Sequence, residues 1–192
     1  ISLIPRFYDA TDGEVLVDGV NVKNYKFDTL YDKLGYVTQK AVLFAGSIRE
    51  NVFFGESAAP ETDEELKNAI ELSQAEEFVD KLPDGAEHMI SQMGRNVSGG
   101  QKQRLSIARA LSRKPEILVF DDSFSALDYK TDAKLREGLN EKLKDTTKII
   151  VAQRISTIRH ADKIIVLDRG EAVGMGTHEE LMKNCDVYKE IA

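Results

Sequence analysis

The chain contains a short polar stretch whose residue types and spacing suit the binding of an anion. Ser98, Gly99 and Gly100 place a hydroxyl group and two residues without side chains directly before a helical pattern. A helix N-terminus has unpaired N–H groups and a partial positive charge, and glycine lets an anion approach that backbone. Five basic residues and no acidic residue lie between Gln101 and Pro115. Ser-Gly-Gly alone would indicate only a surface helix, but a second polar stretch follows it.

That second stretch is a pair of carboxylates after an apolar run. Ile117–Phe120 is continuously apolar and is followed by Asp121 and Asp122. Such a run is typical of a parallel strand that is buried on both faces. A carboxylate at the end of this strand can hold Mg²⁺, which proteins bind through one or two carboxylates together with phosphates and water. The two stretches together favour a site for a phosphate bound to a metal ion.

Alternating strands and helices are expected to position these groups. Strand patterns cover Leu34–Thr38, Ile117–Phe120 and Lys148–Ala152, the last as a second buried strand, and a helix is expected from about Lys130 to Lys144. This alternation predicts an α/β sheet with ligand groups at its strand ends.

Hairpins and capped helices are expected outside that sheet. Strands Glu14–Val17 and Val20–Val22 flank an Asp18-Gly19 turn, and Ile164–Leu167 precedes a second strand at Ala172–Gly174. Capping boxes are expected at two helix starts, Ser47 with Glu50 and Thr177 with Glu180.

Composition excludes several classes of protein. The 192 residues are 42% hydrophobic, enough for one compact domain, and the net charge of −7 argues against a nonspecific nucleic-acid binder. The single cysteine, Cys185, excludes an internal disulfide and is expected to be structural. The longest apolar runs fall far short of the ~20 residues that a membrane-spanning helix needs. His88, His160 and His178 are expected to be surface or capping residues.

Ser98–Gln101, the basic helix after it and the strand ending in Asp121-Asp122 resemble the signature motif and the Walker B strand of an ATP-binding cassette (ABC) ATPase. The resemblance covers nearly the whole chain. It implies a P-loop NTPase-like (RecA-like) α/β core with an ABC helical subdomain and a partial antiparallel β layer. Residues 1–192 would be a single domain, with 1–39 and 115–192 forming the core and β layer and about 47–112 the helical subdomain.

The phosphate-binding loop of these ATPases has no counterpart in this sequence. That loop reads Gly-x-x-x-x-Gly-Lys-Ser/Thr, and no Gly-Lys dipeptide occurs here. Ile1–Tyr8 resembles the end of the helix that follows the Walker A lysine. The resemblance therefore implies that the sequence begins just after Walker A, with that motif and the N-terminal strands missing. Such a fragment is expected to be inactive by itself.

The resemblance assigns roles to residues of this sequence. Gln39 would be the Q-loop glutamine that reaches Mg²⁺ or the attacking water, and Asp121 would hold the metal. Ser98, Gly99, Gly100 and Gln101 would bind ATP that is held by another chain, and Asp128 resembles the D-loop aspartate that bridges the two sites. Asp128 could also simply cap the helix that follows it.

Two positions depart from the family pattern. Asp122 stands where a catalytic glutamate is usual, and its shorter side chain draws the carboxylate back by roughly 1 Å, a shift that can cost about 10²-fold in rate. Gln153 stands where a histidine is usual, and an amide neither titrates nor transfers a proton near neutral pH. Asp122, Gln153 and Gln39 are the expected catalytic positions, and the two departures indicate a degenerate site.

An intact signature beside a weakened Walker B strand resembles one half of a heterodimeric ABC exporter. The implied cofactors are ATP and Mg²⁺. The implied partners are a second, different nucleotide-binding domain and a transmembrane domain fused upstream, with no nucleic acid. The acidic stretch Glu56–Glu87 would belong to the helical subdomain that abuts the transmembrane part, at the cytoplasmic face of the cell membrane.

Three other readings remain open. An ABC ATPase of DNA repair or chromosome organisation would carry long coiled coils, but only ordinary helices separate Gln39 from Ser98. A non-enzymatic regulatory α/β module could use Asp121 and Asp122 to bind Mg²⁺, yet it leaves the Ser98–Gln101 segment unexplained. An importer ATPase is the third alternative, since the choice of exporter depends on the weaker segments Phe44–Val52 and Ser123–Asp128.

Overall fold

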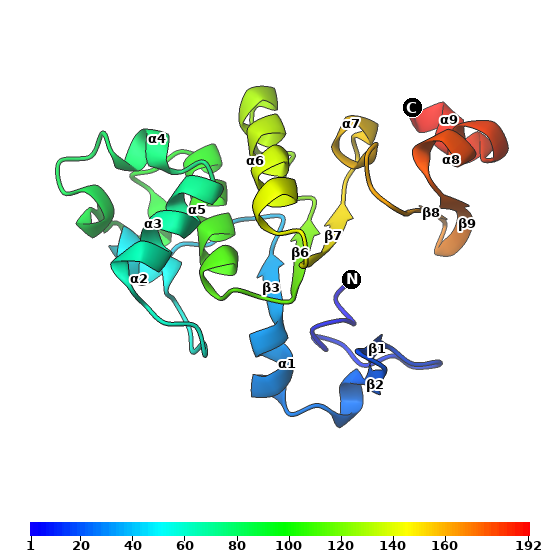
Figure 1. The fold of residues 1–192 in the computed structure, drawn as a ribbon, viewed down its shortest axis with the longest axis horizontal. Helices are drawn as coiled ribbons and strands as arrows, with labels where there is room; N and C mark the ends of the chain where they lie inside the picture. Colours follow the sequence, from blue (N-terminus) through cyan, green and yellow to red (C-terminus); the bar gives the residue numbers. More distant parts are fainter. The chain divides into compact units, whose positions relative to one another are not determined.

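A computed structural model describes residues 1–192 of the chain. The chain divides into two compact units, Ile1–Ile149 and Ile150–Ala192 (Figure 1). Each unit is described by itself below.

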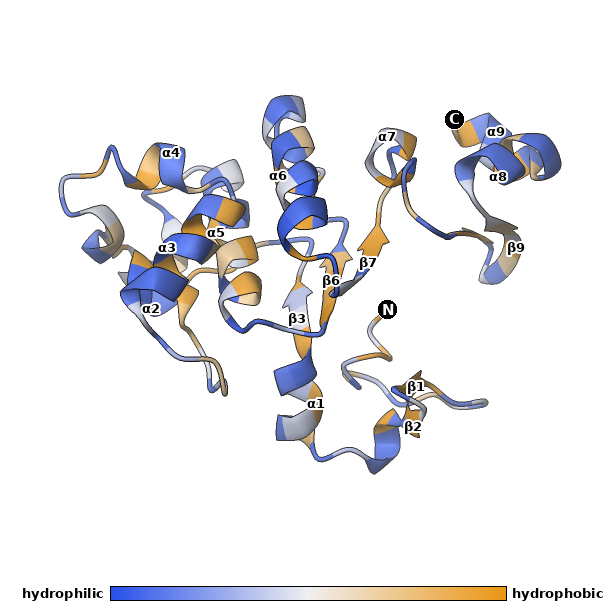
Figure 2. Cartoon of the chain, in the orientation of Figure 1, coloured by the Kyte–Doolittle hydropathy of each residue, from blue (hydrophilic) through white to orange (hydrophobic).

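A three-stranded sheet with the order β3-β6-β7 contains the apolar run that ends at the carboxylates. Strand β3 (Leu34–Val37) pairs in parallel with β6 (Ile117–Asp121), and Val37 lies opposite Phe120. The core of β6 is fully buried, and Figure 2 shows that this strand is hydrophobic along most of its length. The sequence-based prediction of a buried parallel strand is therefore confirmed for β6.

Strand β7 (Thr147–Val151) differs from the expectation that it is a second buried strand. Its residues are half-buried in the middle and exposed at both ends. β7 is the last strand in the sheet order, with a neighbour on one side only, so its side chains stay partly open to solvent. An apolar run identified the strand but not how deeply it is buried.

The N-terminal segment does not form the helix that was expected over Ile1–Tyr8. It forms hydrogen-bonded turns, in which Ile4 N–H donates to the Ile1 carbonyl at 3.0 Å. Pro5 has no N–H group for a helical bond, and Arg6 adopts a left-handed φ of 58°. The expectation was wrong because the apolar pattern was read without these two breaks.

A small β-hairpin follows the turns. Strands β1 (Leu16–Val17) and β2 (Val20–Asn21) are antiparallel and joined by Asp18 and Gly19, both with positive φ. Positive φ at both central positions is the geometry of a type I′ hairpin turn. A 3₁₀ turn (Val22–Asn24) and helix α1 (Phe27–Lys33) then lead into β3. The expected hairpin is confirmed.

Short helices fill the middle of the chain. They are α2 (Ile48–Val52), α3 (Asp63–Leu72) and α4 (Glu76–Val79), with 3₁₀ turns at Gly85–Glu87 and Gln92–Gly94 and a strand pair β4 (Gly46–Ser47) and β5 (Met89–Ile90). Leu66, Ile70, Leu72 and Phe78 are buried. Helix α5 (Gly99–Ser112) packs against α2 and α3.

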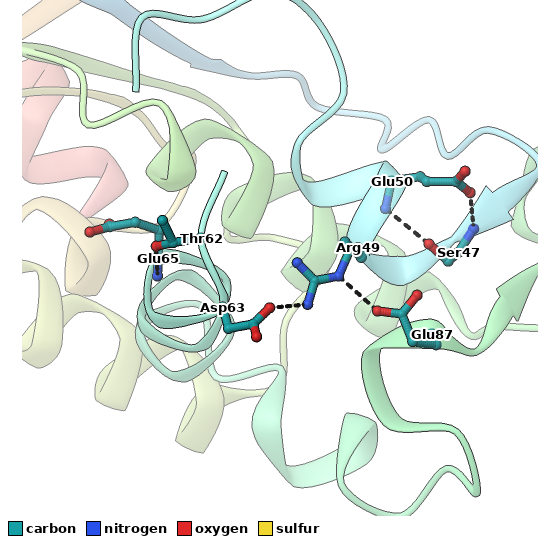
Figure 3. A network of polar contacts seen from close by, with 7 residues as sticks. All are labelled: Ser47, Arg49, Glu50, Thr62, Asp63, Glu65 and Glu87. Carbon is teal, nitrogen blue, oxygen red and sulfur yellow. Dashed lines mark hydrogen bonds and ion pairs between the residues drawn. The ribbon is translucent and has the colours of Figure 1, made fainter. Parts of the chain in front are cut away.

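An ion-pair network connects three of these short elements (Figure 3). Arg49 of α2 donates from Nε to Glu87 at 2.7 Å and from a terminal nitrogen to Asp63 at the start of α3. The expected capping box of α2 is present, since Ser47 Oγ accepts from the Glu50 N–H at 3.1 Å and Glu50 accepts from the Ser47 N–H. Both acidic partners of Arg49 are exposed, so these ion pairs orient the helices more than they stabilise them.

The first unit also contains helix α6 (Tyr129–Lys142), within two residues of the expected bounds. Asp128 is its N-cap: Asp128 Oδ1 accepts from the Thr131 N–H at 3.0 Å, and Oδ2 accepts from the Thr131 hydroxyl at 2.6 Å. These hydrogen bonds from Thr131 lower the pKa of the Asp128 carboxyl.

The second unit is a hairpin covered by short helices. It contains α7 (Ile155–Ile158), strands β8 (Ile164–Asp168) and β9 (Glu171–Gly176), and helices α8 (His178–Asn184) and α9 (Asp186–Ile191). The capping box of Thr177 and Glu180 starts α8 as expected.

A small core holds the second unit together. Cys185 and Tyr188 lie in this core, which agrees with a structural role for the thiol. His178 is partly buried, and its Nδ1 lies 3.0 Å from the Tyr188 hydroxyl. None of the helices of either unit is long and apolar enough to span a membrane.

Candidate functional site: a helix N-terminus and a strand end

The first candidate site is the N-terminus of α5. Ser98 is the N-cap of this helix, and its Oγ accepts from the Gln101 N–H at 3.3 Å. Gln101 Oε1 accepts in return from the Ser98 N–H at 2.8 Å. This capping box fixes the first turn and gives Gln101 a structural role at the position where the resemblance expects a ligand contact.

The two glycines leave this helix end open. A Cβ atom on Gly99 would meet nothing within 4 Å, and one on Gly100 would lie 3.5 Å from the Ala126 carbonyl oxygen. The first N–H groups of a helix have no acceptor within the helix. Those of Gly99 and Gly100 can therefore donate to an anion, with the helix dipole in support.

The five basic residues between Gln101 and Pro115, three of them in α5, have a different role from the one their number suggested. Each of the five contacts the chain itself: Lys102 with the Met93 carbonyl, Arg104 with the Gln74 carbonyl, Arg109 with the Asn51 carbonyl, Arg113 with Asp32 and Lys114 with Glu65. These basic side chains thus bind acceptors in neighbouring segments of the chain. Backbone N–H groups and the Ser98 hydroxyl remain as the donors for a phosphate.

The second candidate site lies at the carboxyl ends of β3 and β6. The parallel register brings Gln39, just after β3, to Asp122, just after β6. Gln39 Nε2 donates to Asp122 Oδ2 at 3.0 Å, although 83 residues separate the two in sequence. Three of the predicted site residues, Gln39, Asp121 and Asp122, therefore gather at one edge of the sheet.

Tyr36 is a member of this site that the sequence analysis missed. Its hydroxyl donates to Asp121 Oδ2 at 3.2 Å. Burial raises the pKa of the Tyr36 phenol, and the Asp121 carboxylate beside it adds to the rise, so the hydroxyl remains a donor. The available signal was strand alternation: Tyr36 lies opposite Val119, two residues before Asp121, but that register is known only once β3 and β6 are paired.

Asp122 is held in an unusual conformation. The residue is 8% exposed and its φ is 46°, in the left-handed region that aspartate tolerates better than most residues. The Ser125 hydroxyl donates to the Asp122 carbonyl at 2.7 Å and stabilises this turn. The adjacent Ser123 hydroxyl is fully buried without a hydrogen-bond partner.

The donor set at the strand end suits Mg²⁺. The chain contributes two carboxylates and an amide oxygen, all hard oxygen ligands, and no cluster of three or more histidine, cysteine or acidic residues that could hold a metal by itself. Mg²⁺ is normally held by one or two carboxylates and completes its shell with phosphates and water. Asp121 and Gln39, the predicted ligands, would hold the ion here, and their metal-binding role stays a prediction.

Two further predicted site residues, Gln153 and Asp128, remain. Gln153 is an exposed residue of the second unit, and its catalytic role stays a prediction. Asp128 is exposed and caps α6, which is the simpler of its two interpretations, and its D-loop role stays a prediction as well.

A parallel α/β sheet with polar ligands at its strand ends and an anion-accepting helix N-terminus defines a nucleotide-binding domain of the P-loop NTPase-like class. The family model for ABC transporters matches residues 1–125. The chain belongs to the ABC transporter family.

Known relatives agree with this assignment. The chain is 46% identical over 195 residues to an uncharacterised ABC transporter ATP-binding protein of Mycobacterium tuberculosis. It is 43% identical over 191 residues to a Staphylococcus aureus protein named for multidrug export as an ATP-binding/permease protein. Each alignment covers 100% of this chain and 33% of the relative, so the chain spans about a third of the length of these relatives.

A solved structure is similar over the same extent. It is that of a bacterial Atm1-family ABC exporter with ATP bound, with a TM-score of 0.93 and 35% sequence identity. The match covers 99% of this chain and 33% of the exporter chain. The mixed α/β fold is therefore that of an exporter's nucleotide-binding domain.

Proposed function

We propose that the chain is the ATP-binding domain of an ABC exporter, in which it couples binding and hydrolysis of MgATP to transport across a membrane. The observation that carries the proposal is the meeting of Gln39, Asp121 and Asp122 at one sheet edge in a chain that also has an open, capped signature helix. One relative is named for multidrug export and the similar solved structure is that of an exporter, which supports an exporter over an importer.

The site at the strand end is proposed to be degenerate. Asp122 is one methylene shorter than glutamate, and its carboxylate already accepts a hydrogen bond from Gln39 at 3.0 Å. A base that is displaced by roughly 1 Å can lose about 10²-fold in rate. Gln153 would bind a γ-phosphate without exchanging a proton with it. ATP at this site would stay bound and would be hydrolysed only slowly.

The signature is proposed to act on a nucleotide held by a second, different nucleotide-binding domain. Open space around Gly99 supports this role, because an ATP molecule held elsewhere needs free access to the helix end. Ser98, Gly99 and Gly100 would then donate to its phosphates. In such a heterodimer this chain supplies half of the competent site although its own site is weak.

A transmembrane domain of the same protein is the second proposed partner, and it would place the chain at the cytoplasmic face of the cell membrane. Phe44 and Phe54 stack at 4.0 Å between ring centroids, yet are 42% and 49% exposed. Val42, two residues before Phe44, is 54% exposed. Exposed apolar side chains that gather into a contiguous patch can mark a protein–protein contact. We name Val42, Phe44 and Phe54 the aromatic patch.

The test of the function uses the full-length protein with its partner domain, reconstituted in lipid. Wild-type protein is expected to hydrolyse ATP in a Mg²⁺-dependent manner, with nucleotide trapping at the site that is completed by Ser98–Gly100. Absence of Mg²⁺-dependent hydrolysis would refute the function. The double variant Asp122→Glu with Gln153→His is expected to add trapping at this chain's own site. Trapping that stays confined to the other site in that variant would refute the degeneracy.

A second measurement concerns the 192-residue polypeptide by itself. It contains no Gly-Lys dipeptide and thus no phosphate-binding loop of the Walker A type. Without that loop, the lysine and the backbone N–H groups that cradle the β- and γ-phosphates are missing. Calorimetry is expected to show no tight binding of ATP to this polypeptide, and micromolar affinity would contradict the expectation.

A further inference from the structure

Arg109 of α5 joins two other segments of the chain. Its Nε donates to the Asn51 carbonyl at 2.7 Å, one terminal nitrogen donates to the Val42 carbonyl at 2.9 Å, and the other donates to Asn51 Oδ1 at 3.1 Å. These acceptors are uncharged oxygens. Burial lowers the pKa of Arg109 to about 10, so the guanidinium stays charged at neutral pH. The residue is thus a partly buried cation held by carbonyl groups.

The same guanidinium lies beneath the aromatic patch. Its central carbon is 5.5 Å from the ring centroid of Phe44 and 5.5 Å from that of Phe54. Both distances lie within the range of a cation–π contact, and such an attraction grows when water is excluded. A partner that covers the patch would remove water and strengthen the contact. Arg109 therefore links the exposed patch to α5.

The segment that carries Gln39 is attached to α5 on both sides. Gln103, which is 1% exposed, donates to the carbonyl of Thr38 at 3.2 Å, directly before Gln39. Arg109 binds the carbonyl of Val42, three residues after it. Asn51 extends the attachment, since it exchanges two hydrogen bonds of 2.9 Å with the backbone of Phe44.

We propose that Arg109 is a positioning residue that fixes the Gln39 segment and the aromatic patch to the signature helix, so that the three move together. Helix α5 has 14 residues, about 21 Å at 1.5 Å per residue, and is a rigid connection from Ser98 to Arg109. A displacement of the patch reaches Gln39 through Val42 and reaches Gly99 and Gly100 through α5. This inference rests on the proposed function. Within that function, it assigns the coupling of the aromatic patch, the Gln39 segment and the signature helix to the side chain of Arg109.

Arg104 offers a matched control on the same helix. It also donates to a backbone carbonyl, that of Gln74 at 2.8 Å, and its guanidinium lies 5.0 Å from the Phe78 ring centroid. Its contacts reach the α3–α4 turn instead of the Gln39 segment. Changing Arg104 removes a guanidinium that also contacts a backbone carbonyl and an aromatic ring, so it reports the cost of losing such contacts elsewhere on α5.

The experiment compares Arg109→Gln, Arg109→Lys and Arg104→Gln in the full-length protein with its partner domain. Lysine keeps the charge of Arg109 but lacks the fork that reaches several acceptors at once. Arg109→Gln is expected to lower kcat for ATP by about 10- to 100-fold through misplacement of Gln39, with KM within about twofold. Arg109→Lys is expected to fall in between, and Arg104→Gln to keep kcat within about threefold of wild type, the scale of an ordinary contact.

Hydrogen exchange separates this proposal from the proposed function, because it needs no ATP. Arg109→Gln and Arg109→Lys are expected to lose backbone protection at residues 38–46, and Arg104→Gln at residues 73–79. Loss of protection throughout the first unit in Arg109→Lys would show a merely structural role and overturn the proposal. So would equal kcat values for Arg109→Gln and Arg104→Gln. A wild type without ATP hydrolysis would refute the function but leave the exchange result to decide the attachment.

Discussion

The N-terminus of α5 and the carboxyl end of β6 are built by opposite means. At the helix end, Ser98 and Gln101 bond each other across three residues of sequence. At the strand end, the bonds Gln39–Asp122 and Tyr36–Asp121 join residues that are 83 and 85 positions apart. The helix end therefore forms wherever α5 forms. The strand end exists only when β3 and β6 are paired.

The packing around a glycine near each site differs as well. Gly99 at the helix end has open space around its Cα, while Gly35 in β3 has none: a Cβ there would lie 2.7 Å from Leu118, 2.8 Å from Pro115 and 2.9 Å from the Ala110 carbonyl oxygen. An open glycine is suited to receive a ligand, and a crowded one holds sheet and helix together. The two glycines allow the comparison to be tested by the same kind of substitution.

The largest effect is expected from Gly99→Asp in the full-length protein with its partner. A carboxylate beside the free N–H groups repels a phosphate and competes for its donors, and loss of one such donor typically costs about 100-fold in rate. Gly99→Ala is the comparison variant and should lose less activity, because its methyl group meets no atom of this chain and carries no charge. Equal activities of the two variants would exclude phosphate binding at this helix end.

Gly35→Ala tests the close packing of β3 against β6 and α5. The new methyl group would force apart β3, β6 and α5, and overpacking of this kind costs about 1–3 kcal/mol. Denaturant unfolding of the full-length protein's nucleotide-binding domain should show this loss, whereas Gly99→Ala should remain within about 0.5 kcal/mol of wild type. Similar stability of both variants would contradict the packing described for Gly35.

Ser98→Ala removes the cap of α5. The Gln101 N–H then loses its acceptor, which is expected to cost about 1 kcal/mol. Ser98→Gly is the control, because glycine at an N-cap costs only a few tenths of a kcal/mol by comparison. Thermal unfolding should rank wild type, Ser98→Gly and Ser98→Ala in that order. Reversal of the two variants would show that the hydroxyl does not cap the helix.

Tyr36→Phe is expected to give a small effect on stability. It removes one hydrogen bond to Asp121 and leaves the ring in contact with Phe7, so stability should fall by about 0.5–1.5 kcal/mol. Without the phenol, Asp121 is free to turn, and the Mg²⁺ concentration for half-maximal ATPase activity should change. An unchanged Mg²⁺ dependence would leave Tyr36 with a packing role only.

Features that depend on neighbouring residues could be predicted from the sequence and assigned to specific residues. The hairpin turn at Asp18-Gly19 and the capping boxes of Ser47 and Thr177 are confirmed, because each depends on contacts within a few residues. The turns at residues 1–7 were missed although their causes, Pro5 and the left-handed Arg6, are local as well. A proline within an apolar pattern was given too little weight there.

Features that depend on distant contacts could not be predicted in the same way. The sequence indicated that Asp121 and Asp122 follow a strand, but not that Tyr36 and Gln39 bind them. Five basic residues between Gln101 and Pro115 were evident in the sequence, but not that each of them contacts another part of the chain. Arg109 was among them, and its contacts with Val42 and Asn51 follow only from the packing of α5 against α2.

The sequence by itself determined the signature helix, its cap and the apolar strand that ends at two aspartates, because these depend on periodicity and on neighbours within one helical turn. The tertiary structure alone decided which side chains surround the aspartates and what the arginines of α5 hold. Those contacts span many tens of residues, and their register is set by strand pairing and helix packing. Physical proximity in the fold, and not spacing in the chain, makes the strand end a site.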